Sequence, residues 1–136
     1  MTDYAKPLPN ITEDVEPFWT SAKAHTLSMP QCQDCGEVIW PLSPVCPACL
    51  GDHLEWTALS GKGVLWSWVN FHQGFNQEWA KESPYNVAHV RLEEGPIFLT
   101  NIVEAEDDEL AVGMAVEVVF DDVTDEVSIP KFRPAG

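Results

Sequence analysis

Apolar residues recur along the N-terminal part of the chain at the spacing of one helix face. The stripe comprises Val15, Phe18, Trp19 and Ala22. These positions lie on one side of a helix, so the pattern predicts an amphipathic helix over residues 13–25. Pro17 fits this helix because its missing N–H has no intrahelical partner in the first turn. We expect the stripe to dock the helix on the body of the protein; its presentation to a partner subunit is the alternative.

Beyond residue 60 the pattern changes to short segments rich in β-branched and aromatic residues. These segments span residues 63–72, 85–93, 96–103, 115–121 and 127–132. Several of them alternate between apolar and polar residues, which is typical of strands with one buried face. Glu94-Gly95 predicts a tight turn between two antiparallel strands. Five strands with little helix among them indicate a mainly β fold, a small closed or nearly closed Greek-key barrel.

Composition and charge narrow the class of protein. A chain of 136 residues with 45% apolar residues fits one domain, or one domain with a small appendage. It shows neither a secretory signal nor a run of about 20 apolar residues, so we expect a cytoplasmic protein with no membrane partner. The net charge of −15, with 22 acids against seven Lys and Arg, disfavours nucleic acid, because phosphate binding depends on cations.

All four cysteines lie close together in the sequence. They are Cys32, Cys35, Cys46 and Cys49, spaced as C-x2-C, ten residues, C-x2-C. Two such turns bring four thiolates onto one tetrahedral ion, and cytoplasmic thiols stay reduced. A zinc ribbon is the favoured interpretation, and rubredoxin-like iron is the alternative. Four protein ligands leave zinc no open position, so the site is predicted to be structural and not catalytic.

Four residues near the cysteines are expected to support the metal site. Gly36 and Gly51 follow the two cysteine pairs, where a small residue or a positive φ helps the backbone to curl around the ion. Trp40 and Trp56 flank the site and are expected to cover its thin core. The cysteines are therefore assigned to folding.

No catalytic set is recognisable in the rest of the sequence, because the histidines are scattered and no nucleophile or nucleotide-binding motif is present. His72 opens a loop that carries Phe75 and Trp79 among polar residues. Large aromatic residues on a loop are candidate anchors for another protein; the alternative is that they fold back on the barrel.

Three cations are candidate contacts for a phosphate-bearing ligand. Lys131 and Arg133 share one face of the C-terminal segment "PKFRP", and Arg91 lies on a predicted strand. Such cations could bind a phosphate group. Neutralisation of nearby acids is the favoured interpretation for Lys131 and Arg133.

The ordered set of motifs resembles a known family. The matching pieces are "EPFWTSAK", "CQDCG…SPVCPAC", "SGKGVLWSW", "SPYNVAHVRLEEGPIFLTNIV", "VGMAVEVVF" and "IPKFRP". Together they resemble the acyl-CoA-associated OB-fold proteins with an N-terminal rubredoxin-like zinc ribbon, long catalogued as a domain of unknown function. "WPLSP" departs from the family pattern, which has Pro-Arg in the middle. The resemblance implies an arm and helix over 1–26, a zinc ribbon over 27–57 and a five-stranded OB-fold barrel over 58–136.

The resemblance also implies a function. Members of this family are small partners of thiolase-like enzymes, including lipid-transfer-protein-type thiolases, and some assist retro-aldol cleavage of β-hydroxyacyl-CoA side chains, as in steroid degradation. We therefore expect a non-catalytic subunit of a hetero-oligomeric acyl-CoA enzyme that performs retro-aldol, Claisen or acyl-transfer chemistry. A free-standing acyl-CoA-binding protein is the alternative. A nucleic-acid-binding module is disfavoured by the charge.

Overall fold

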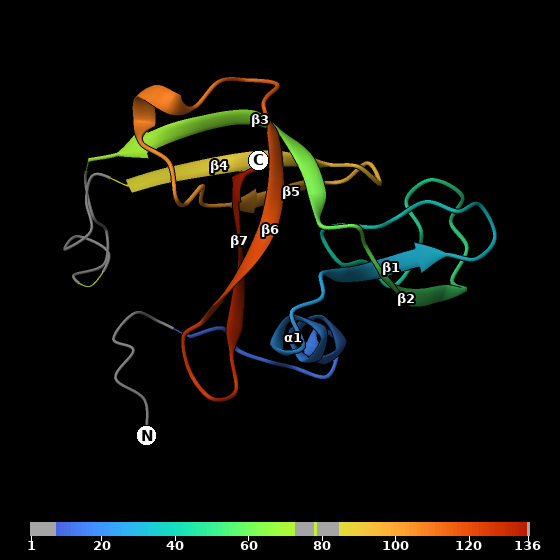
Figure 1. Cartoon of the computed structure of the whole chain (residues 1–136). Helices are drawn as coiled ribbons and strands as arrows, with labels where there is room; N and C mark the ends of the chain where they lie inside the picture. Colours follow the sequence, from blue (N-terminus) through green and yellow to red (C-terminus); the bar gives the residue numbers. More distant parts are fainter. Residues whose placement is uncertain (1–7, 73–77, 79–84, 136) are drawn as a thin grey trace.

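The structure is a computed structural model that describes residues 8–72, 78 and 85–135. It contains one helix, a two-stranded sheet and a curled five-stranded sheet (Figure 1). In the described part of the chain, no helix has the length and apolar character needed to cross a membrane. The mainly β fold expected from the sequence is confirmed.

Helix α1 spans Glu16–Lys23 and is shorter than predicted. Pro17 lies in its first turn, as expected, and Phe18 and Ala22 form its buried face. The helix ends in a Schellman motif, in which the Thr26 N–H donates to the Ser21 carbonyl (2.9 Å). His25 adopts the positive φ of 60° that this motif requires. The backbone therefore turns out of the helix before residue 25, where the apolar pattern alone placed its end.

The two-stranded sheet forms the base of the cysteine region. Strand β1, Ser28–Cys32, pairs antiparallel with β2, Leu54–Ala58. The segment between these strands carries the four cysteines, and Figure 1 shows it extending to one side of the five-stranded sheet.

The larger sheet is antiparallel throughout, in the order β5-β4-β3-β6-β7. Its elements are β3 Lys62–Phe71, β4 Tyr85–Leu92, β5 Ile97–Thr100 and, after the 3-10 turn η1 Asp107–Glu109, β6 Ala115–Asp122 and β7 Ser128–Pro134. These strands coincide with the five predicted segments to within a few residues, and the turn at Glu94-Gly95 joins β4 to β5. The curled sheet is consistent with an OB-fold.

The two ends of the curled sheet meet beyond β5, where Ile102 forms a parallel bridge with Phe132 of β7. The Asn86 side chain holds this segment from β4. Its Nδ2 donates to the Ile102 carbonyl (2.7 Å), and its Oδ1 accepts from the Ile102 N–H (2.7 Å). The side-chain amide thus replaces the backbone of a neighbouring strand and satisfies both polar groups of a buried residue.

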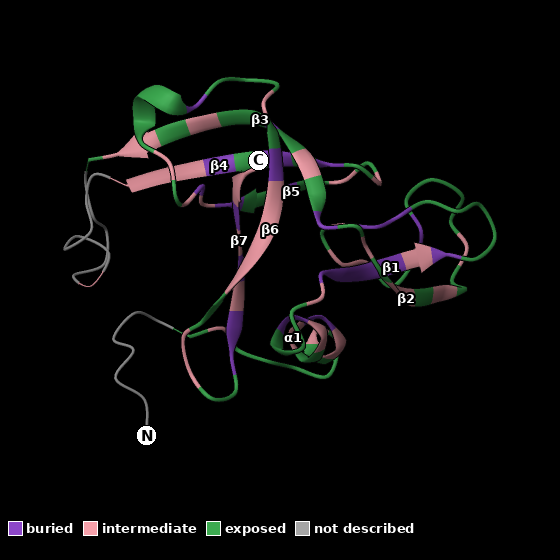
Figure 2. Cartoon of the chain, in the orientation of Figure 1, coloured by how far each residue is buried: buried purple, intermediate pink, exposed green. Residues whose placement is uncertain are grey.

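One hydrophobic core joins the helix, the two-stranded sheet and the curled sheet. Phe18, Met29 and Phe132 come from these three parts and belong to the same cluster of buried residues. Figure 2 shows the buried segments of β1, β4 and β7 in purple. The cysteine region and the curled sheet therefore do not have separate main cores.

A polar contact also joins the end of the helix to the β6–β7 hairpin. Asp122 accepts a hydrogen bond from the buried Ser128 hydroxyl, and its Oδ1 lies 2.8 Å from His25 Nε2. The pKa of Asp122 is lowered, first by the Ser128 hydrogen bond and then by His25.

Because the folded-state pKa is lowered, Asp122 contributes stability above its ordinary pKa, near pH 4, and this contribution is lost as pH falls through the lower folded-state value. Ser128→Ala is expected to raise the pKa of Asp122 toward its ordinary value. The free energy of unfolding of the variant should then fall below wild type at pH 7, and this deficit should shrink as the solution is acidified below about pH 4. Urea unfolding at several pH values measures the difference, and a deficit that grows on acidification would contradict the assignment.

Candidate functional site

The four cysteines converge on one point. Their sulfur atoms all lie within 4.8 Å of one another. The Sγ atoms of Cys32 and Cys49 are 3.6 Å apart, as are those of Cys35 and Cys46. These separations are far too long for a disulfide bond, whose sulfurs lie about 2.05 Å apart. Zn–S bonds of about 2.3 Å in a tetrahedron place the sulfurs about 3.8 Å apart, so the arrangement fits a metal ion.

The two C-x2-C turns share one hydrogen-bond pattern. In the first, the Cys32 N–H donates to the Glu37 carbonyl (2.8 Å), and the Gly36 N–H donates to the Cys32 carbonyl (2.9 Å). In the second, the Cys46 N–H donates to Gly51 and the Leu50 N–H donates to Cys46, both at 2.8 Å. Each turn is therefore held in shape by its own backbone, and the thiols need not be positioned by bulky neighbours.

The electrostatics of the free thiols favour a cation. The pKa of Cys32 is lowered to about 7, and the main cause is the hydrogen bond that the Cys35 N–H donates to its sulfur. The N–H of Glu37 lowers the pKa of Cys35, but the neighbouring thiol of Cys46 and burial outweigh it and raise that pKa to about 12. Four thiols this close cannot all ionise alone, whereas a divalent ion stabilises all four thiolates together.

The glycines after the cysteine pairs differ in their roles. Gly36 adopts the expected positive φ of 85°. In the second turn the positive φ of 65° belongs to Leu50 and not to Gly51, which corrects the expectation. A Cβ on Gly51 would lie 2.7 Å from an Asp34 carboxylate oxygen and 3.3 Å from Cys49 Sγ. The missing side chain of Gly51 therefore lets the second cysteine turn lie close to Asp34 of the first turn.

Leu50→Gly is expected to stabilise the metal-loaded protein by about 1 kcal/mol, because an L-residue in the left-handed region costs about 1–2 kcal/mol. Leu50 is 78% exposed, so little packing is lost. Thermal unfolding of the metal-loaded protein measures the change. Leu50→Ala removes the same packing but keeps the Cβ, so it should show no gain; equal gains for both variants would mean that φ is not the cause.

The aromatic residues near the cysteines pack elsewhere than expected. Trp40 stacks on Phe18 with ring centroids 5.0 Å apart, and both Trp40 and Trp56 lie against the main core. The small core at the metal site consists of Cys32, Ile39 and Cys46, with Leu54 packed against it. The expectation that the tryptophans cover the metal site is therefore wrong. The sequence did not show that Trp40 would pack on α1, because that contact depends on where the helix docks.

A polar link between the two cysteine turns escaped the sequence analysis. His53 Nδ1 lies 3.3 Å from Asp34 Oδ1, and the Gln33 N–H donates to the His53 carbonyl (2.8 Å). The hydrogen bond to Asp34 is the main cause that raises the pKa of His53. Such pairs between separate loops leave no periodic signal in a sequence.

The structure places the other candidate residues apart from the cysteines. His72 is exposed at the end of β3, and Arg91 is exposed on β4. Phe75 and Trp79 lie outside the described residues. Lys131 pairs with Asp121 (2.9 Å), while Arg133 pairs with Glu117 (3.1 Å) and Glu104 (3.4 Å). These ion pairs are the ones that neutralisation of nearby acids requires.

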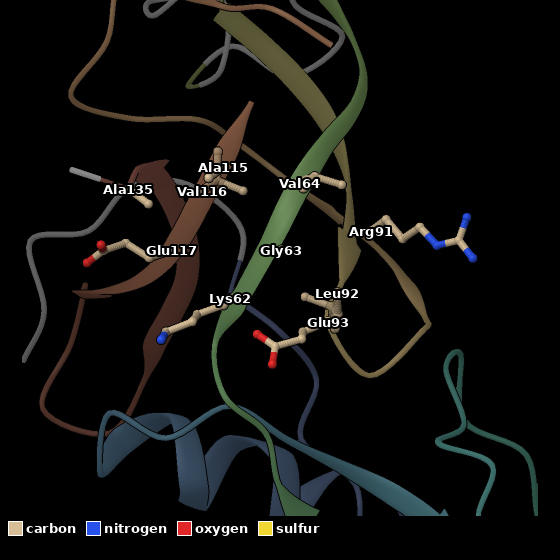
Figure 3. A pocket seen from close by; sticks show the side chains of 10 residues that line it. All are labelled: Lys62, Gly63, Val64, Arg91, Leu92, Glu93, Ala115, Val116, Glu117 and Ala135. Carbon is tan, nitrogen blue, oxygen red and sulfur yellow. The ribbon is translucent and has the colours of Figure 1, made fainter. Parts of the chain in front are cut away.

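A groove of about 380 Å³ lies between β3–β4 and β6. Its lining includes Lys62, Gly63, Glu93 and Glu117, and Figure 3 shows Lys62 and Glu117 on the side next to β6. Gly63 lets β3 and β4 approach closely, since a Cβ there would lie 2.5 Å from the Arg91 carbonyl oxygen. Both signs of charge border the groove, so its charge does not select an anion.

The fold and the cysteine site define a zinc-ribbon and OB-fold protein. Residues 19–55 match the family model "ChsH2, rubredoxin-like zinc ribbon domain", and residues 56–121 match "ChsH2, C-terminal OB-fold domain". The chain therefore belongs to the ChsH2 family of DUF35 proteins.

Several relatives and one solved structure are similar over most of this chain. A DUF35 domain-containing scaffold protein of Methanothermobacter thermautotrophicus is 33% identical, with 85% of this chain and 87% of the relative covered. A probable enoyl-CoA hydratase alpha subunit of Thermomonospora curvata is 32% identical, with 96% and 40% covered. The solved structure titled Ltp2-ChsH2(DUF35) aldolase has a TM-score of 0.84 at 31% identity, with 95% of this chain and 100% of that chain covered.

A shorter match involves the benzoylsuccinyl-CoA thiolase subunit BbsA of Thauera aromatica, which is 31% identical with 47% of this chain and 42% of the relative covered. The chain spans only part of several curated relatives. It covers 40% of the Thermomonospora protein, and 61% and 64% of two further archaeal scaffold proteins.

Proposed function

We propose that this chain is a non-catalytic accessory subunit of a thiolase-like, lipid-transfer-protein-type acyl-CoA enzyme. The catalytic subunit would perform the retro-aldol cleavage of a β-hydroxyacyl-CoA such as a steroid side chain, or a related Claisen or acyl-transfer reaction. The observation that carries this proposal is the likeness, over 95% of the chain, to a chain of an aldolase complex.

The names of the relatives support the same general role. They describe a hydratase alpha subunit, a thiolase subunit and scaffold proteins. The reactions in these names differ, but each CoA-related name describes a subunit. A shared subunit architecture with differing chemistry is what an accessory protein with catalytic partners would produce.

The chemistry of the described residues also supports a non-catalytic role. We propose that Cys32, Cys35, Cys46 and Cys49 hold one structural zinc ion. Such an ion contributes folding free energy, and four protein ligands leave it no position for substrate. Among the described residues, the Ser67 hydroxyl lies 3.5 Å from His89 Nδ1 on the exposed side of the sheet, but no described carboxylate is hydrogen-bonded to this imidazole. The pair therefore lacks the third member of a catalytic triad.

A free-standing acyl-CoA-binding protein is less well supported. Lys131 and Arg133, the cations that could bind coenzyme A phosphates, are engaged with carboxylates of β6 and of the segment after β5. Release of these pairs would cost part of the binding free energy. Calorimetry of the isolated chain with coenzyme A separates the two functions: binding without any partner supports the carrier and counts against the subunit.

Purification of the tagged full chain from its native host tests the proposal. A thiolase-like polypeptide is expected to co-purify, and mass spectrometry identifies it. Co-expression should then make that polypeptide soluble and active, whereas alone it should be insoluble or inactive. Turnover of an acyl-CoA by this chain alone, or full activity of the thiolase-like protein without it, would contradict the proposal.

A further inference from the structure

Strands β3, β4 and β5 contain no acidic residue. The chain has 22 Asp and Glu, yet the segments Lys62–Phe71, Tyr85–Leu92 and Ile97–Thr100 have none. These three strands are neighbours in the curled sheet. All the acids of the chain, which give it a net charge of −15, therefore lie outside these three strands.

The outward side of these strands exposes large apolar residues. Inward positions such as Leu65, Val90 and Phe98 are buried in the main core. We define the outer apolar face by Val64, Trp66 and Val69 of β3 and Ile97 and Leu99 of β5. These five side chains are 37%, 47%, 54%, 42% and 60% exposed, respectively. Five of the ten exposed large apolar side chains among the described residues therefore lie on β3 and β5, on either side of β4.

The pairing register brings these residues together. Val64, Arg91 and Ile97 lie side by side across β3, β4 and β5, and Ser67, His89 and Leu99 form the next row. Large contiguous apolar patches on soluble proteins commonly mark interaction sites. These rows contain Val64, Ile97 and Leu99, while Val69 lies opposite Val87 further along β3 and β4, and Trp66 contacts Arg91 of the first row.

Arg91 stands in the middle of the outer apolar face. Its guanidinium carbon lies 5.2 Å from the centroid of the Trp66 ring, a cation–π contact. Figure 3 shows the guanidinium extending away from the strands that line the groove. In contrast to Lys131 and Arg133, Arg91 forms no ion pair with any residue that the structure describes. Its hydrogen-bond donors are therefore available to a carboxylate of another molecule.

A second copy of this chain does not fit the outer apolar face. Two chains of charge −15 repel each other. An isologous contact would also place Arg91 against the same acid-free face of the partner, where the described strands offer no carboxylate. The occupant that fits is a different polypeptide with an apolar surface and a carboxylate opposite Arg91.

We propose that the outer apolar face is the surface on which the catalytic subunit docks. The general position of the interface follows from this face alone, while the identity of the occupant as a thiolase-like protein rests on the proposed function. Stable interfaces bury about 800 Å² per partner, and Trp and Arg dominate their energetics near the centre. Trp66, Arg91 and Leu99 form such a centre, and Val64, Val69 and Ile97 belong to the same face.

Binding measurements with the full chain and the thiolase-like polypeptide identified by native purification test the docking site. Leu99→Asp and Arg91→Glu are each expected to weaken the affinity by about 30-fold or more, as for residues at the centre of an interface. Leu50→Asp, which places the same charge on an exposed leucine of the cysteine region, should change the affinity less than about threefold. Circular dichroism and zinc content confirm that each variant is folded.

The outcomes separate the docking site from the proposed function. If wild type captures no thiolase-like protein, the proposed function fails. If it does, but Leu99→Asp and Arg91→Glu bind it like wild type, or Leu50→Asp weakens binding equally, the docking site is wrong and the proposed function stands. Sedimentation of the isolated wild-type chain tests the remaining occupant: a dimer that Leu99→Asp dissociates would mean that a second copy covers the face.

Discussion

Cys46→Ser is expected to leave the chain largely unfolded. A four-cysteine zinc site contributes about 10 kcal/mol or more to folding, which is comparable with the entire net stability of about 5–15 kcal/mol of a typical domain. Cys46 is fully buried in the small core at the metal site. Met29 and Val38 each lie three residues from a cysteine in the sequence and belong to the main core, so loss of the metal should disturb the curled sheet as well.

Far-UV circular dichroism, thermal unfolding and elemental analysis of the purified protein measure this effect. Val45→Ser is the matched control. It introduces a serine at the position before Cys46, where the side chain is 37% exposed, and should leave metal content and fold unchanged. Chelation of the wild-type protein should reproduce the effect of Cys46→Ser, and re-addition of zinc should reverse it. A metal-free protein that melts like the loaded one would contradict the structural role, and elemental analysis also decides between zinc and iron.

Asn86→Ala is expected to destabilise the protein by about 2–4 kcal/mol, because each buried backbone group left without a partner costs about 1–3 kcal/mol. Removal of the side chain deprives both the N–H and the carbonyl of Ile102 of hydrogen bonds. Ile102 is only 3% exposed, so water does not readily replace them. Urea unfolding measures the change in free energy, with a lower midpoint and an unchanged slope.

Asn86→Asp provides a matched control for this prediction. At pH 7 the carboxylate keeps the acceptor for the Ile102 N–H but faces the Ile102 carbonyl without a proton, so this variant should also be destabilised. When the carboxyl is protonated, it regains a donor in nearly the same place. Stability of Asn86→Asp relative to wild type should therefore recover as pH falls below about 5. A deficit independent of pH would show that the donor to Ile102 is unimportant.

The strands and the metal ligands were predictable from sequence because their signals are local. Each strand alternates or is rich in β-branched residues, and the spacing of the cysteines places two thiols on each turn. Pro17 likewise marked the first turn of the helix. These features depend on neighbours a few residues away, so tertiary packing does not override them.

The features that escaped prediction depend on distant residues. Asn86 looks like an ordinary polar residue in an alternating strand, yet its partner lies 16 residues further along the chain. Trp40 was assigned to the metal site by its position in the sequence, whereas its stacking partner Phe18 belongs to the helix. In "GVLWSWVNF", apolar residues on both faces were interpreted as strand propensity alone; the outward ones are exposed in the structure and form part of the proposed docking face.

The single core shared by the helix, the ribbon and the curled sheet has a consequence for assembly. Two modules joined by a loose linker would have to be immobilised relative to each other when a partner contacts both, and that loss of freedom would weaken association. Here Phe18 and Phe98 pack together with centroids 6.2 Å apart, so this alignment is completed during folding. The chain is preorganised, and a larger share of the contact energy with a partner would remain for affinity.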